Sequence, residues 1–171
     1  MQKITQNQLM EKAVSLLENG TVTAVLGWGK GEFGYDVTPK MLTTKEDLEE
    51  NFVWNDFCGA NFSKYLVSKT DRFEGKILVF LKPCDTYSFN QLLTEHRFDR
   101  EKVYAVGIPC EGMVDVSKLK AVTGEGISEI KEDGENILVT TIYEESPIAV
   151  PVADVLPHGS GESQSTLILI R

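Results

Sequence analysis

The chain has 171 residues, which suits a single domain with a substantial hydrophobic core, and a formal net charge of −9. Because the chain is acidic and has neither a basic run nor an apolar stretch of the roughly 18 residues that a membrane span needs, nucleic-acid binding and membrane insertion are both disfavoured. The first residues lack the apolar core of a signal peptide, and three cysteines are an odd number for a secreted disulfide framework, so we expect a cytoplasmic protein.

The first predicted elements lead into a glycine-rich segment. Apolar residues at helical spacing predict an amphipathic helix over residues 7–19, and the strand TVTAVLG follows it. This strand runs into Gly27, Gly29 and Gly31. Backbone without side chains can approach a phosphate or a flavin closely, so the three glycines are candidate cofactor contacts. The spacing is neither a P-loop nor the dinucleotide fingerprint, and a surface loop explains it at least as well.

The next segment ends at the first cysteine. Residues 35–42 read as an extended piece, and Thr44 begins a short acidic helix with a solvated face. An aromatic cluster then leads to Cys58, from which a helix is expected to run to about Ser68. Cys58 is therefore predicted at or just before a helix N-terminus, where backbone N–H groups favour a thiolate.

Two apolar runs dominate the middle of the chain, at Ile77–Leu81 and at residues 103–108. Nearly continuous apolar runs of this length are typical of parallel strands covered on both faces. Between them, apolar residues at helical spacing predict a helix over residues 85–97, with Asp85 as its N-cap. The resulting strand–helix–strand unit predicts two parallel, neighbouring strands.

Both runs end in the same signature of proline, cysteine and an acidic residue, at residues 83–85 and 109–111. Because parallel neighbours end at one edge of a sheet, Cys84 and Cys110 are predicted to lie close together at the carboxyl edge, where open α/β sheets bind ligands. Cys58, Cys84 and Cys110 follow one another at intervals of 26 residues. Inert packing remains the alternative for each cysteine, and most of all for Cys58, which lacks the signature.

The C-terminal part changes in character. Residues 116–122 predict a short helix, and two alternating strands, 127–131 and 136–143, meet across Asp133-Gly134, a strong hairpin signal. Beyond the hairpin, residues 144–171 carry prolines and serines that describe a loop or tail with a possible edge strand near its end.

The predicted fold class is therefore α/β, with a mainly parallel sheet, crossover helices and a C-terminal β-hairpin. We divide the chain into a single α/β domain, residues 1–143, and a divergent tail, residues 144–171. Neither histidine has a setting that suits a general acid or base, so no catalytic side chain is predicted.

The segments LKPCD and VYAVGIPCEGMVD, together with Phe57-Cys58, resemble the beta subunits of deazaflavin-coenzyme-reducing hydrogenases and formate dehydrogenases, over about residues 1–143. The resemblance implies an electron-transfer subunit or domain of an oxidoreductase complex in anaerobic metabolism. It implies a [4Fe–4S] cluster, often FAD, and partners that are other subunits or a soluble electron carrier. It also implies that Cys84, Cys110 and Cys58 bind metal or line a flavin pocket.

Several features of the sequence bear on which cofactor this site would hold. Lys82 is a candidate for offsetting negative charge on a cofactor, with Asp85 beside it as a cap. A cubane cluster usually takes four thiolates, and this chain has three, so a fourth ligand would come from a partner, a second copy or a different side chain. The alternatives are a thiol–disulfide or metal-binding module that uses Cys84 and Cys110, and a non-enzymatic partner-binding domain with a degenerate cofactor site.

Overall fold

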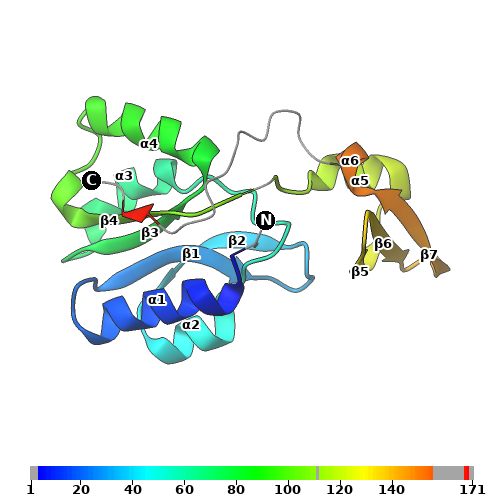
Figure 1. Cartoon of the computed structure of the whole chain (residues 1–171), viewed down its shortest axis with the longest axis horizontal. Helices are drawn as coiled ribbons and strands as arrows, with labels where there is room; N and C mark the ends of the chain where they lie inside the picture. Colours follow the sequence, from blue (N-terminus) through cyan, green and yellow to red (C-terminus); the bar gives the residue numbers. More distant parts are fainter. Residues whose placement is uncertain (1–3, 111, 156–167, 170–171) are drawn as a thin grey trace.

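A computed structural model describes residues 4–110, 112–155 and 168–169 of the chain. Its elements form two sheets with their helices (Figure 1). The helices are α1 (Gln6–Glu18), α2 (Lys45–Asn51), α3 (Ser63–Arg72), α4 (Pro83–Thr94), α5 (Val116–Thr123) and α6 (Val152–Val155), with a 3₁₀ turn at Arg100–Lys102. The strands are β1 (Ala24–Lys30), β2 (Val37–Leu42), β3 (Ile77–Leu81), β4 (Val103–Gly107), β5 (Ile127–Asp133), β6 (Asn136–Thr141), β7 (Glu144–Pro151) and β8 (Ile168–Leu169).

The larger sheet has five strands in the order β2-β1-β3-β4-β8. Strands β1, β3 and β4 are parallel, whereas β2 and β8 pair antiparallel at the two edges. The neighbours β3 and β4 are aligned residue by residue, from Ile77 with Val103 to Leu81 with Gly107. The predicted fold class, a mainly parallel α/β sheet with two adjacent central strands, is confirmed.

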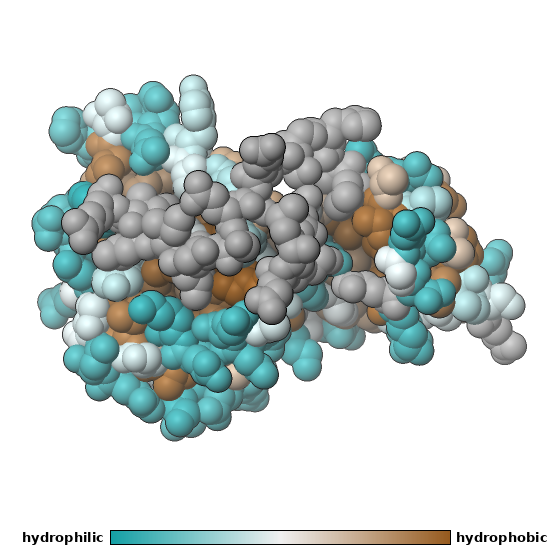
Figure 2. Space-filling view, in the orientation of Figure 1, coloured by the Kyte–Doolittle hydropathy of each residue, from teal (hydrophilic) through white to brown (hydrophobic). Residues whose placement is uncertain are grey.

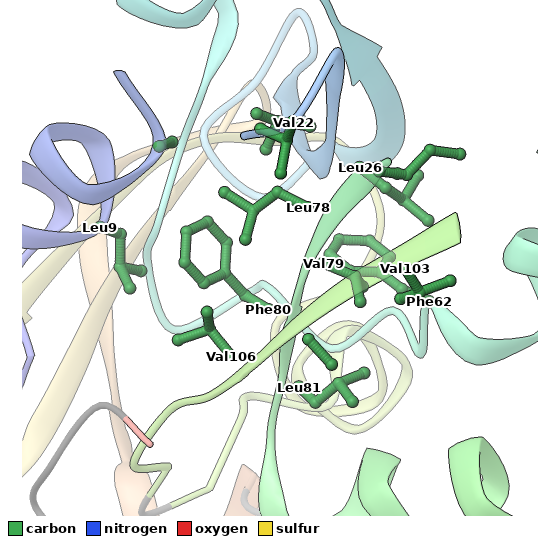
Figure 3. Close-up of a cluster of buried hydrophobic side chains, with 14 of the residues drawn as sticks. Leu9, Val22, Leu26, Phe62, Leu78, Val79, Phe80, Leu81, Val103 and Val106 are labelled. Atoms are coloured by element: carbon green, nitrogen blue, oxygen red, sulfur yellow. The ribbon is translucent and has the colours of Figure 1, made fainter. Parts of the chain in front are cut away.

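Helices cover both faces of this sheet, with α1 and α2 on one side and α3 and α4 on the other (Figure 1). Every residue of β3 is buried, as the continuous apolar run predicted. Because side chains alternate along a strand, Phe80 points toward Leu9 of α1 while Val79 lies on the side of Phe62 (Figure 3). Polar residues cover the outer side formed by α1 and α2, which agrees with the predicted solvated face (Figure 2).

The glycine-rich segment is a strand, which corrects the prediction of a loop after a strand. Gly27 and Gly29 lie within β1 and pair with Lys40 and Thr38 of β2 in an antiparallel hairpin. Gly31 follows directly and donates its N–H to the carbonyl oxygen of Asp36 at 2.8 Å. Backbone pairing continues through all three glycines because the hairpin closes only after them.

The smaller sheet is antiparallel, in the order β5-β6-β7, and has its own core under α5 and α6. The predicted hairpin between β5 and β6 is confirmed, with Gly134 at φ 62° in the turn, a conformation that glycine adopts readily. Residues 144–151 were expected to be a loop, and this is wrong, because they form β7 and pair with β6. Proline is tolerated there because β7 is an edge strand.

The remaining end of the chain reaches the larger sheet. Residues 168–169 pair with Val106 and Gly107 of β4, so the expected edge strand near the C-terminus is present. Residues 156–167 of the expected tail lie outside the described residues. The division of the chain at residue 143 stays a prediction. Within the described part of the chain, no helix combines the length and apolar character that crossing a bilayer requires.

Candidate functional site

Two of the three cysteines lie at the carboxyl edge of the larger sheet. Leu81 and Gly107 are the last paired residues of β3 and β4, and the N–H of Ile108 continues the pairing with Leu81 at 2.9 Å. Cys84 and Cys110 each follow three residues after this last pair. Cys84 is exposed and Cys110 is half-buried. The sequence prediction that one edge of the sheet receives both cysteines is borne out by this register.

The helix after β3 begins earlier than predicted. Its first residue is Pro83, its N-cap is Lys82, and Cys84 therefore lies in the first turn. Proline suits this first position because its missing N–H has no partner in a helix anyway. Asp85 is the third helical residue and not the N-cap, and its carboxylate accepts a hydrogen bond from the backbone N–H of Lys82 at 3.2 Å.

Lys82 and Asp85 are buried charges of the site, each with 1% of its surface exposed. The Lys82 ammonium is paired on several sides. Its Nζ lies 3.0 Å from the Asp85 carboxylate, and it donates to the backbone carbonyls of Cys58 at 3.1 Å and Ala60 at 3.0 Å. The face of Trp28 covers the ammonium, 4.9 Å from the ring centroid. A buried charge is stable only when it is paired and hydrogen-bonded, and this environment meets both conditions.

An ammonium has three hydrogens, and these three acceptors account for all of them. Lys82 therefore ties three segments together: the end of β1 through Trp28, the segment 58–60, and the first turn of α4. That Lys82 offsets negative charge on a cofactor stays a prediction.

Cys58 lies in the interior, away from a helix start. The helix that follows begins at Ser63, five residues later than the thiol. The Cys58 sulfur accepts a hydrogen bond from the N–H of Asn55 at 3.3 Å and donates to the carbonyl of Val53 at 3.6 Å. Burial raises the pKa of the Cys58 thiol to about 12. The prediction of a polarised thiol at a helix N-terminus is therefore wrong for Cys58.

The thiols at the edge also differ from the prediction. Burial raises the pKa of Cys84, and the adjacent Asp85 carboxylate raises it further. Burial likewise raises the pKa of Cys110, against the opposing effects of the Gly112 N–H and of Lys82. A helix N-terminus was expected to favour the thiolate, but here an acidic neighbour and partial burial outweigh it.

The residues present do not fit a complete [4Fe–4S] cluster held by this chain alone. A cubane needs about four thiolates, and of the three cysteines Cys58 is a buried hydrogen-bond donor. Across residues 4–110, 112–155 and 168–169, no group of three or more His, Cys, Asp or Glu side chains is placed to hold a metal ion. A cluster would therefore require rearrangement of these segments or ligands from another chain.

The glycines do not offer an open cradle for a flavin phosphate, because a side-chain carbon at each position would meet atoms already in place. At Gly27 it would lie 3.0 Å from the ring of Phe52, and at Gly29 2.7 Å from Lys40. At Gly31 it would clash with the backbone of Asp36. Close packing of the hairpin accounts for these glycines, and their contact with a cofactor stays a prediction.

Sequence reasoning missed the polar support beneath the first turn of α4. Ser63 and Ser88 both donate to the carbonyl of Asp85, at 3.2 and 3.0 Å, and Asn61 donates to Ser88 at 2.7 Å. These residues are distant in the chain and show no periodic pattern that could reveal the contact. The buried indole N–H of Trp28 has no hydrogen-bond partner among the residues that the structure describes.

The fold and this edge define a class of protein, an α/β chain whose two parallel central strands are each followed by a cysteine. No protein-family model matches the chain. The F420-dependent formate dehydrogenase subunit beta of Methanocaldococcus jannaschii is 31% identical over 103 residues, 58% of this chain and 26% of that protein. The F420-dependent formate dehydrogenase 1 subunit beta of Methanococcus maripaludis is 31% identical over 107 residues, 58% of this chain and 25% of that protein.

A solved structure, the F420-reducing [NiFe] hydrogenase complex from Methanosarcina barkeri, matches with a TM-score of 0.60 and 16% identity. The match covers 91% of this chain and 62% of that one, and at this identity it shows the fold alone. The chain spans about a quarter of the length of the curated relatives it matches. The predicted resemblance is confirmed at low identity: the chain is similar to the beta subunits of F420-dependent formate dehydrogenases over 103 to 107 residues.

Proposed function

We propose that this chain is an electron-transfer subunit or domain of a cytoplasmic oxidoreductase complex, with its redox site at the carboxyl edge of the larger sheet. The proposal rests mainly on one observation. Two parallel, directly paired strands each carry a cysteine three residues past their last common pair, and both cysteines are at least partly accessible. The names of the relatives support an oxidoreductase setting.

Partners follow from the same relatives. Each is named as a subunit of a dehydrogenase that depends on a deazaflavin coenzyme. We infer other subunits of a redox complex, or a soluble electron carrier, as the partners of this chain. Its acidic surface, at a formal net charge of −9, favours a partner with a complementary basic patch.

The second part of the proposal concerns the cofactor. An iron–sulfur cluster or a flavin at this edge would use Cys84 and Cys110, and a cubane would take its remaining thiolates from Cys58 after rearrangement or from another chain. When bound, such a group supplies one- or two-electron chemistry. The residues of this chain supply accessible sulfur at Cys84 and Cys110 and the fixed positive charge of Lys82.

The experiment is an absorption spectrum of the chain purified without oxygen, together with analysis of iron, sulfide and flavin. We expect chromophore bound to the wild-type chain, with or without its co-purified partner, and its loss in Cys84→Ser and Cys110→Ser. The exposed Lys45, on α2, supplies a control variant, Lys45→Ser, that should retain the chromophore. A preparation without iron or flavin, whose cysteines also form no disulfide that can be reduced, would overturn the proposed function.

A further inference from the structure

The carboxyl edge holds two sulfur atoms in an arrangement that needs no cofactor to carry electrons. We propose that Cys84 and Cys110 form a reversible dithiol–disulfide pair, a two-electron site made of the protein's own sulfur. This inference rests on the proposed function for its role, since it names the group that would take up electrons at that edge.

Strand register brings the ends of β3 and β4 to neighbouring positions, and each cysteine follows one of these ends. Neighbouring strands are about 4.8 Å apart, and a disulfide joins Cα atoms roughly 4.4–6.8 Å apart. Leu81 and Gly107 are direct partners, the N–H of Ile108 bonds to Leu81, and each cysteine follows at the same offset. Cys110 acts electrostatically on both Cys84 and Cys58, so the strand ends and the burial of Cys58, and not this effect, single out the pair of Cys84 and Cys110.

The two sides of the pair differ in accessibility in the way that thiol exchange requires. Cys84 is exposed, so an incoming disulfide can reach its sulfur, whereas Cys110 is half-buried and suits the resolving position. Cys58 is fully buried and its sulfur is engaged with Asn55 and Val53. The third cysteine is thereby set apart from the exchange.

The turn that carries Cys84 is held firmly. Asp85, the next residue, bonds through its carboxylate to Lys82 and through its carbonyl to Ser63 and Ser88. These bonds fix the first turn of α4 against α3 and the segment 58–60. A fixed cysteine loses less conformational entropy when it forms a disulfide, so the anchored turn favours the intramolecular bond over a mixed disulfide with solvent thiols.

The chemistry balances with a disulfide as the oxidant. The Cys84 sulfur, after loss of its proton, attacks one sulfur of the incoming disulfide, the S–S bond of the incoming molecule breaks, and one thiolate leaves. The Cys110 sulfur, also deprotonated, then attacks Cys84, and the second thiolate leaves as the Cys84–Cys110 bond forms. The two leaving thiolates take up the two protons, so two thiols of the chain are oxidised while one external disulfide is reduced to two thiols.

The test uses the full chain, freed of metal with a chelator and equilibrated without oxygen in buffers of reduced and oxidised glutathione. After acid quenching and alkylation, mass spectrometry locates any disulfide. We expect a Cys84–Cys110 bond, formed reversibly with one midpoint, in the wild-type chain and equally in Cys58→Ser. Cys84→Ser and Cys110→Ser should form no internal disulfide.

Two outcomes would overturn the inference. One is a wild-type chain whose Cys84 and Cys110 stay free, or carry only glutathione, in the most oxidising buffer. The other is a bond that involves Cys58 as often as Cys110. This readout is independent of the iron and flavin analysis. If the chain binds a chromophore but forms no bond between Cys84 and Cys110, the dithiol–disulfide pair is refuted and the proposed function stands.

Discussion

The segment around Cys58 and the edge that carries Cys84 and Cys110 share one sequence spacing but differ in environment. Cys58 is buried, hydrogen-bonded through its sulfur, and has a thiol pKa raised to about 12. Cys84 and Cys110 lie at the ends of paired strands with their surfaces partly open. Equal intervals along the chain therefore do not imply equal chemistry. The accessible cysteines follow the ends of paired strands, whereas the interior segment 58–60 is held by hydrogen bonds from Lys82.

The largest expected effect comes from removing the Lys82 ammonium, which joins the segment of Cys58 to the first turn of α4. Lys82→Met removes the ammonium from the buried Asp85 carboxylate and from two backbone carbonyls, which we expect to cost about 3–5 kcal/mol of unfolding free energy. Urea unfolding measures this loss. In the matched double variant, Lys82→Met with Asp85→Asn, no uncompensated charge remains, so a smaller loss is expected. A loss below about 1 kcal/mol for the single variant would contradict the role of Lys82 as the tie between the regions.

The second prediction compares the cysteines directly. Cys58→Ala removes the acceptor of a buried N–H, that of Asn55, and should cost about 1–3 kcal/mol. Cys58→Ser keeps a donor and an acceptor in place and should cost less. Cys84→Ser, at an exposed position, should stay within about 0.5 kcal/mol. Equal losses at residues 58 and 84 in urea unfolding would remove the distinction between interior and edge.

The last effect is absent at neutral pH and appears only in alkali. Because the folded state raises the pKa of Cys58 to about 12, the unfolded chain releases this proton first, near its ordinary value of about 8.5. The stabilising contribution is therefore complete below that value and falls as the pH rises toward 12. The limiting slope is about 1.4 kcal/mol per pH unit.

The measurement is the difference in unfolding free energy between the wild-type chain and Cys58→Ser from pH 8 upward. Other groups that titrate in this range affect both proteins alike and cancel in the difference. A difference that is flat with pH would mean that the Cys58 thiol is not protected by burial.

The shared edge of Cys84 and Cys110 could be predicted from sequence because it follows from local patterns. Apolar runs define strands, helical spacing defines the crossover, and parallel neighbours must end together. The burial of Cys58 could not be predicted in this way. Cys58 belongs to the main hydrophobic core, and the long side chain of Lys82 donates hydrogen bonds to the carbonyls of Cys58 and Ala60. These contacts join distant segments of the chain, so no periodic pattern in the sequence reveals them.

Two other misses have different physical causes. In β7, the alternation of Ile148 and Val150 was a strand signal, but the prolines of this segment outweighed it, although an edge strand tolerates proline. In β1, the glycines suggested a loop because small residues are common there. Pairing with β2 and close contact with side chains such as Phe52 require small residues for a different reason, which only the tertiary structure displays.

The most direct test of the redox edge is an oxygen-free reductive titration that counts the electrons accepted by each chain of the oxidised protein. We predict that the wild-type chain and Cys58→Ser accept the same number, and that Cys84→Ser and Cys110→Ser both accept fewer. Equal electron uptake by all four proteins would contradict the assignment of the redox site to the carboxyl edge of the larger sheet.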